Sequence, residues 1–145
     1  MKDLKEEHIK LEVDSDIKNL ELVKNFMKDT LSEIECSDEQ IMRIFLALEE
    51  IFMNVCSYAY NQKQGKVIVD MSFNNDKSIV YITIIDMGEP FNPLERDEFD
   101  VESHVKNRQV GGLGIFLAGS IMDSMSYEYK DHENRLTLEK KLIYS

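Results

Sequence analysis

The sequence lacks the features that would place it outside the ordinary globular proteins. No stretch approaches the roughly 18 consecutive apolar residues of a membrane-spanning helix. Residues 1–7 carry no apolar segment of a secretory signal. Internal repeats, low-complexity segments and interdomain linkers are also absent from the 145 residues. We therefore expect a single cytoplasmic domain over residues 1–145 that does not enter the membrane.

Cysteine is scarce. The two that occur, Cys36 and Cys56, form neither a CxxC pair nor a metal-ligand spacing. Cys56 falls within an apolar helical pattern, where a free thiol behaves as a small hydrophobic side chain. Because disulfides are also rare in the cytosol, we expect two free thiols.

Basic residues are outnumbered by acidic ones. The chain has 17 Lys and Arg against 28 Asp and Glu, a formal net charge of -11. Binding to a phosphate backbone requires clustered basic side chains, so nucleic-acid binding is excluded as the main function. The 43% of hydrophobic residues suffices for a core. The acidic surface is compatible with a basic protein partner, although most such surfaces only keep a protein in solution.

Hydrophobic periodicity predicts strands and helices that do not alternate as βαβ units. The predicted elements are, in order, a strand over residues 7–13, a helix from residue 17 to about Glu35, a helix from Ser37 or Asp38 to about Tyr60, strands over residues 66–73 and 79–86, a helix that opens at Gly111, and two strands joined by a turn over residues 131–134. Because neighbouring strands are joined by tight turns, we expect a mostly antiparallel mixed sheet with its helices on one face. The predicted fold class is a two-layer α+β sandwich.

Glu50 and Asn54 form the first polar feature of interest. They lie in the apolar run from Ile41 to Tyr60. Side chains four apart on a helix project from the same face, so the carboxylate and the amide are neighbours at the edge of the core. A pair of this kind is most often a solvated surface pair, and the feature is weak when taken alone.

Asp86 and Gly88 form the second feature. Asp86 ends a predicted strand whose two faces are both apolar, so the sequence does not determine which face is inward. A carboxylate at this position can accept a hydrogen bond from the exocyclic amine of adenine, and Gly88 would let the backbone pass close to the base. The alternative is an ordinary turn. Residues 87–110 contain both prolines and lack periodicity, which is typical of a functional loop.

The third feature is the run Gly111-Gly112-Leu113-Gly114, which opens a predicted helix. Backbone N–H groups at a helix N-terminus bind anions without lysine, so an acidic protein could hold the phosphates of ATP here. Asn54 could then supply an oxygen to Mg²⁺, and Glu50 could act as general base. Glycines before a helix often serve only for capping or packing. The order and spacing of the three features together favour an ATP site.

These features resemble a known family. Its N, G1 and G2 boxes correspond to Glu50-x-x-x-Asn54, Asp86-x-Gly88-x-Pro90-Phe91-Asn92-Pro93 and Gly111-Gly112-Leu113-Gly114-Ile115. The family is the GHKL ATPase superfamily, which includes DNA gyrase B, heat-shock chaperones, mismatch-repair proteins and histidine kinases. The short length and the Ser57-Tyr58-Ala59-Tyr60 segment most resemble bacterial anti-sigma factors that are serine/threonine protein kinases. The resemblance extends from about Ile9 to Leu142.

The resemblance implies a Bergerat-type ATP-binding fold and a partner switch. Such proteins bind a sigma factor in one state, and in the other they phosphorylate an anti-sigma-factor antagonist of the STAS type, with ATP and Mg²⁺ as cofactors. The resemblance implies that Glu50 is the general base, that Asn54 is the magnesium ligand, and that Asp86 with Gly88 recognises adenine. It implies phosphate binding by Gly111, Gly112, Leu113 and Gly114. It also implies an ATP lid over residues 91–110, in which Lys106 and Arg108 either contact phosphate or are merely solvated. A homodimer through the first strand and first helix is a further hypothesis.

The sequence departs from the family at two positions. Tyr58 stands where several kinase members carry histidine, and we expect it to line the nucleotide edge as a packing aromatic. Glu133-Asn134 stands where many members carry Gly-Thr, which puts the polar contact of that strand in question. An ATP-gated protein-binding module with little or no kinase activity is the alternative function, and the catalytic domain of a histidine kinase ranks third.

Overall fold

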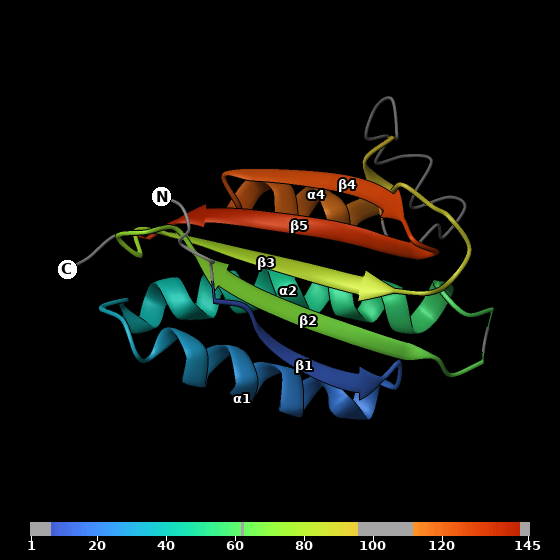
Figure 1. The fold of residues 1–145 in the computed structure, drawn as a ribbon, viewed down its shortest axis with the longest axis horizontal. Coiled ribbons are helices and arrows are strands. Elements are labelled where there is room, and N and C mark those ends of the chain that lie inside the picture. Colours follow the sequence, from blue (N-terminus) through green and yellow to red (C-terminus); the bar gives the residue numbers. More distant parts are fainter. Residues whose placement is uncertain (1–6, 62, 96–111, 143–145) are drawn as a thin grey trace.

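The computed structural model describes residues 7–61, 63–95 and 112–142. Its elements are the strands β1 (Ile9–Asp14), β2 (Lys66–Phe73), β3 (Ile79–Asp86), β4 (Ser124–Lys130) and β5 (Glu133–Lys141), the helices α1 (Leu20–Leu31), α2 (Asp38–Tyr58) and α4 (Gly112–Ile121), and 3-10 turns at Ile17–Asn19 and Pro93–Glu95. The strands form one sheet in the order β1-β2-β3-β5-β4, and every pairing among them is antiparallel. The three helices layer against one face of the sheet, which confirms the predicted α+β sandwich (Figure 1).

The inward face of β3 carries the row that ends at Asp86. Val80 and Ile82 are fully buried, Ile84 is 2% exposed and Asp86 is 7% exposed. The three apolar residues belong to the core that the helices close, together with Val23 and Met27 of α1 and Leu48 and Phe52 of α2. The period-two alternation of the strand therefore places a carboxylate at the end of a buried apolar row, on the side of the sheet that faces the helices.

Helix α2 is 21 residues long and begins where the sequence predicts. The Ser37 hydroxyl accepts a hydrogen bond from the backbone N–H of Gln40 at 3.1 Å, which is the expected N-cap. The preceding helix is shorter than predicted, because α1 ends at Leu31 rather than near Glu35. Residues 32–37 instead reverse the chain direction, and Ser37 keeps the extended backbone that an N-cap requires.

The turn between β4 and β5 is also shorter than predicted. Asp131 and His132 alone connect the strands, with φ of 54° and 65°, the conformation of a two-residue hairpin turn that matches strand twist. Glu133 and Asn134, which the sequence predicts as turn, instead begin β5. The register then pairs Asn134 with Asp86 across β3 and β5.

Cys36 and Cys56 are free thiols, as predicted. Within the described ranges, no helix combines the length and apolar character that crossing a membrane would require.

Candidate functional site

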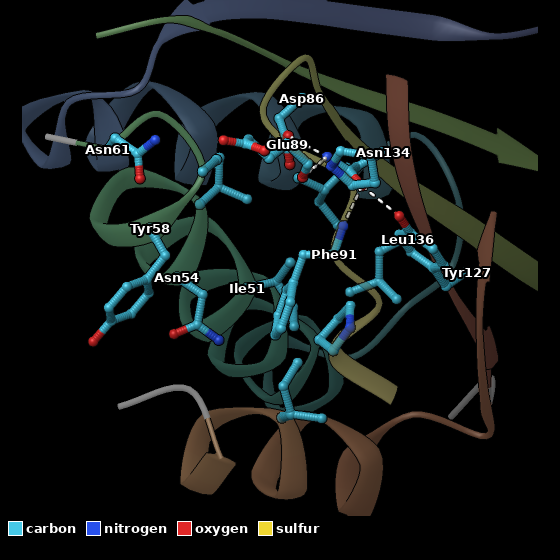
Figure 2. Close-up of a pocket in the computed structure, with 16 residues that line it drawn as sticks. Ile51, Asn54, Tyr58, Asn61, Asp86, Glu89, Phe91, Tyr127, Asn134 and Leu136 are labelled. Carbon is cyan, nitrogen blue, oxygen red and sulfur yellow. Dashed lines mark hydrogen bonds between the residues drawn. The ribbon is translucent and has the colours of Figure 1, made fainter. Parts of the chain in front are cut away.

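A cavity of about 630 Å³ opens between α2, the ends of β3 and β5, and α4 (Figure 2). This volume lies within the range of small-molecule sites, roughly 300–1,000 Å³. Its wall includes Ile51, Asn54 and Tyr58 from α2, Ile84 and Asp86 from β3, Glu89, Pro90 and Phe91 from the segment after β3, Ile115 from α4, Tyr127 from β4, and Asn134 and Leu136 from β5. The lining is mainly apolar with a few polar groups, which is typical of ligand-binding sites.

Glu50 and Asn54 of α2 meet the first turn of α4. A Cβ atom placed on Gly114 would lie 2.7 Å from Oε1 of Glu50 and 3.7 Å from Nδ2 of Asn54. The structure thus brings together residues of the first and third predicted features, which lie about 60 residues apart in the sequence. Asn54 lines the cavity, whereas Glu50 is not among the described residues in its wall. Glu50 and Asn54 are both half-buried, as expected for polar residues at the edge of the core.

Asp86 lies at another wall of the same cavity. Its Oδ1 accepts hydrogen bonds of 2.9 Å from the backbone N–H of Gly88 and from Nδ2 of Asn134. Burial raises the pKa of the Asp86 carboxyl above its usual range, and the hydrogen bonds from Asn134 and Gly88 counter part of that rise. A nearly buried carboxylate held on one oxygen by two donors is an oriented hydrogen-bond acceptor.

Gly88 is required by the protein itself. A Cβ atom at this position would lie 2.0 Å from the carbonyl oxygen of Ala59, just after α2. The expected reason for this glycine was a close approach to a base, whereas the close approach that the structure shows is to the backbone. The absence of a side chain lets the segment after β3 pack directly on the end of α2.

Tyr60 reinforces this junction, although the sequence did not single it out. Its hydroxyl accepts a hydrogen bond of 2.7 Å from the backbone N–H of Met87 and donates one of 2.5 Å to the carbonyl of Lys66. The side chain thereby ties the residue after Asp86 to the start of β2. Tyr58, two residues earlier, lines the cavity and is 51% exposed, which is more open than the packing aromatic that the sequence predicts.

Asn134 is the residue that sequence reasoning missed. Because Glu133-Asn134 replaces the Gly-Thr of many family members, a polar contact from this strand was in question. The Asn134 amide nevertheless makes hydrogen bonds with Asp86, with the backbone of Gly88, Glu89 and Phe91, and with the Tyr127 hydroxyl. Figure 2 shows this amide between Asp86 and Tyr127 at the cavity wall. Period-two alternation back from Leu138 and Leu136 places Asn134 on the inward row, and this signal could have identified it.

Several predicted residues fall outside the described ranges. These are Gly111, Lys106, Arg108 and most of the expected lid; of its residues, 91–95 are described. Phe91 lines the cavity and is 60% exposed. Gly112 is the first residue of α4, so a ten-residue helix begins within the glycine run, where the sequence predicts a helix N-terminus.

The donor set suits magnesium better than a metal caged by the protein. In the part of the chain that the structure describes, no three His, Cys, Asp or Glu side chains cluster as metal ligands. Mg²⁺ keeps several waters and is usually held by one or two protein oxygens together with substrate phosphates. A single amide oxygen from Asn54 beside the Glu50 carboxylate fits that requirement.

The described residues form an open antiparallel sheet with α1, α2 and α4 on one face and a ligand-sized cavity between α2, α4 and the ends of β3 and β5, which is the arrangement expected of a GHKL-type domain. The family model for the histidine kinase-like ATPase domain matches residues 13–140, and the chain belongs to that family. The resemblance drawn from the three sequence boxes is thereby confirmed.

Individual relatives agree with this assignment. The chain is 24% identical over 140 residues to the "Serine-protein kinase RsbW" of Staphylococcus aureus strain bovine RF122 / ET3-1, covering 94% of this chain and 87% of the relative. It is 23% identical to the protein of the same name from strain JH9, with the same coverage. Among solved structures, the RsbU and RsbW domains of Rv1364c from Mycobacterium tuberculosis share the fold, with a TM-score of 0.62 and 19% identity. The match covers 92% of this chain and 32% of that longer one.

Proposed function

We propose that this chain is an ATP-dependent serine/threonine protein kinase that also acts as an anti-sigma factor, and that it works in the cytoplasm. The observation that carries the proposal is the meeting of Glu50, Asn54 and Gly114 beside a cavity whose wall also contains Asp86. The candidate metal ligand and the oriented acceptor for a purine line the cavity, and the candidate base lies beside the metal ligand at the N-terminal turn of α4, which supports the proposal.

The positions of these groups support ATP binding. Asp86 accepts a hydrogen bond from the exocyclic amine of adenine. The phosphates lie at the start of α4, where the backbone N–H groups of Gly112 and its neighbours have no partner within the helix and the helix dipole favours negative charge. Asn54 would hold Mg²⁺, which would offset the negative charge of the phosphates there.

Phosphoryl transfer requires a base for the substrate hydroxyl. The hydroxyl oxygen of a serine or threonine bonds to the γ-phosphorus while the bond from that phosphorus to its bridging oxygen breaks, and ADP leaves. Glu50 takes the proton of the hydroxyl. Its closeness to Gly114 supports this role, because Gly114 belongs to the helix start that we propose for phosphate binding.

The partners are proposed from the family resemblance and from the names of the relatives. Serine-protein kinases named RsbW match nearly the whole chain. We infer that the substrate is a small antagonist of the STAS type, modified on serine or threonine, and that a sigma factor binds in the alternative state.

Phosphate transfer to candidate STAS proteins, measured with radiolabelled Mg-ATP, tests the proposal. We expect phosphoserine or phosphothreonine with wild type, and loss of transfer with retained ATP binding for Glu50→Gln. Glu49→Gln is the matched control, because Glu49 is the adjacent half-buried carboxylate and does not face Gly114. Normal transfer by Glu50→Gln would contradict the assignment of the base.

An ATP-gated binding module remains the second candidate, and one observation favours it. Asn54 lines the cavity whereas Glu50 does not, so ligand binding could persist without transfer. This function predicts complexes with a partner that form or dissociate with ATP while no phosphate moves. Sedimentation of the partner mixtures with and without nucleotide separates the two candidates and also tests the homodimer.

A further inference from the structure

Asn134 is almost buried, with 7% exposure, and its side chain lies in the wall of the cavity. The two-residue turn at Asp131 and His132 sets the register that places Asn134 opposite Asp86. An amide side chain has two N–H donors and an oxygen with two lone pairs. The partners of Asn134 within the protein determine how much of this capacity is left for a ligand.

The hydrogen-bonding capacity of the Asn134 amide is fully used by the protein. Nδ2 donates to Oδ1 of Asp86 at 2.9 Å and to the carbonyl of Glu89 at 3.0 Å, with the carbonyl of Gly88 at 3.3 Å as a weaker third acceptor. Oδ1 accepts from the backbone N–H of Phe91 at 3.1 Å and from the Tyr127 hydroxyl. No donor or acceptor is left for a ligand, so Asn134 can act on a ligand only through its neighbours.

The effect on Asp86 is asymmetric. Both hydrogen bonds that the described residues make to this carboxylate go to Oδ1, from Gly88 and Asn134. A carboxylate oxygen offers about two acceptor positions, so Oδ1 is saturated. Asp86, which lines the cavity, therefore has one oxygen, Oδ2, left to accept a hydrogen bond from a ligand.

A single acceptor distinguishes the two purines. Adenine offers one exocyclic N–H₂ beside a ring nitrogen that is itself an acceptor. The corresponding edge of guanine carries two adjacent donors, the ring N–H and the 2-amino group, which suit a carboxylate with both oxygens free. An oxygen already occupied by protein donors cannot accept the second guanine donor.

We propose that Asn134 is a positioning residue that sets the preference for adenine over guanine nucleotides by occupying Oδ1 of Asp86. The proposal rests on the nucleotide-binding function proposed above. The same amide holds the backbone of Glu89 and Phe91, which form part of the cavity wall next to this carboxylate. One side chain thus fixes both the acceptor and the slot in which the base would lie.

Binding of ATP and GTP to the full chain, measured by calorimetry in Mg²⁺, tests this role. We expect wild type to prefer ATP. Asn134→Leu, which has a similar volume but no donor, should lower the ratio of ATP to GTP affinity by about tenfold or more, because a hydrogen bond to a charged group is removed and an acceptor is freed. Asn134→Thr, which can again donate a hydroxyl to Asp86, should restore part of the preference.

A double-mutant cycle shows whether Asn134 acts through Asp86. Once Asp86→Asn is present, adding Asn134→Leu should leave the ATP-to-GTP ratio unchanged. Thr137→Ala is the control for β5, because Thr137 bonds Thr83 on the opposite face of the sheet, and it should keep the wild-type ratio. Thermal unfolding confirms that each variant is folded.

The contrary outcomes are distinct. If Asn134→Leu weakens ATP and GTP equally, Asn134 has a general structural role and this inference is overturned while the proposed function stands. If wild type binds neither nucleotide, or if Asp86→Asn changes neither affinity, the nucleotide site itself is wrong and both proposals fail. If wild type prefers ATP but transfers no phosphate to any candidate substrate, only the proposed kinase activity is overturned.

Discussion

The carboxylate of Glu50 lies directly against Gly114. A Cβ atom on this glycine would lie 2.7 Å from Oε1 of Glu50. Contact this close forces one group to move. The side chain of Glu50 is the flexible partner, whereas Gly114 belongs to the first turn of α4. A methyl group at this glycine would therefore displace the proposed base without removing it.

Gly114→Ala should abolish phosphate transfer while the protein remains folded. Alanine is favoured over glycine in a helix by about 1 kcal/mol, so lost activity cannot be attributed to a weaker helix. Gly119→Ala is the matched control in the same helix, since its Cβ would meet the flexible end of Met125 at 3.3 Å. Both variants are compared by transfer assay and thermal unfolding. Full activity in Gly114→Ala would show that Glu50 needs no fixed position.

Asp86→Asn should weaken ATP binding at least tenfold, because a charged acceptor for the base is lost. It should also stabilise the ligand-free protein at neutral pH. Burial raises the folded-state pKa of Asp86, so the stability that this group contributes is present below its unfolded-state pKa and is lost as pH rises through the folded-state pKa. Denaturant unfolding should show the advantage of the variant shrinking as pH is lowered. An advantage that persists unchanged in acid would contradict the buried-carboxylate explanation.

Tyr60→Phe should cost about 1 kcal/mol of stability, since the hydroxyl bonds both Met87 and Lys66. It should also weaken ATP binding, because the residue next to Asp86 loses its anchor. Tyr129→Phe serves as the control, because it removes a hydroxyl from an exposed tyrosine that does not line the cavity. Urea denaturation and nucleotide titration measure the two effects, and equal behaviour of the two variants would refute the role of the Tyr60 hydroxyl.

Cys56 should react slowly with thiol reagents at neutral pH. Burial, and to a smaller extent the negative charge of Asp16, raises the pKa of this thiol from 9.0 to about 11. The raised pKa slows the reaction because the thiolate is the reactive species. About a hundredfold less thiolate is then present than for an unperturbed thiol. In the Cys36→Ser variant Cys56 is the remaining thiol. Its rate of labelling by iodoacetamide can then be followed by mass spectrometry. Rapid labelling of the folded protein at pH 7 would contradict this prediction.

Much of the fold follows from local sequence patterns. The 21-residue helix after Ser37 and the hairpin of β2 and β3 are set by periodicity and capping. The adjacency of Glu50 and Asn54 follows from helical geometry alone. Their contact with Gly114 depends on how α2 packs against α4, which no local pattern specifies; the order of the three sequence features suggested it.

The features that were missed arise from tertiary geometry. Gly88 is needed because its segment packs on the carbonyl of Ala59, a contact that cannot be read from either stretch separately. Asn134 was assigned to a turn because its neighbours are polar. Asp131 and His132, both with positive φ, complete the turn between β4 and β5. Because two residues suffice for this turn, Asn134 belongs to strand β5.

The shortness of that turn has an evolutionary consequence. Successive strand residues face opposite sides of a sheet, so a one-residue insertion or deletion that shifted β5 against β3 would turn Asn134 outward. Glu133 or Arg135 would then stand opposite Asp86, giving the carboxylate either a like charge or a counter-ion. Lineages can therefore replace individual side chains of this hairpin more readily than they can change its length. If Asn134 has the role that we propose, a change in length would also alter ligand choice in a single step.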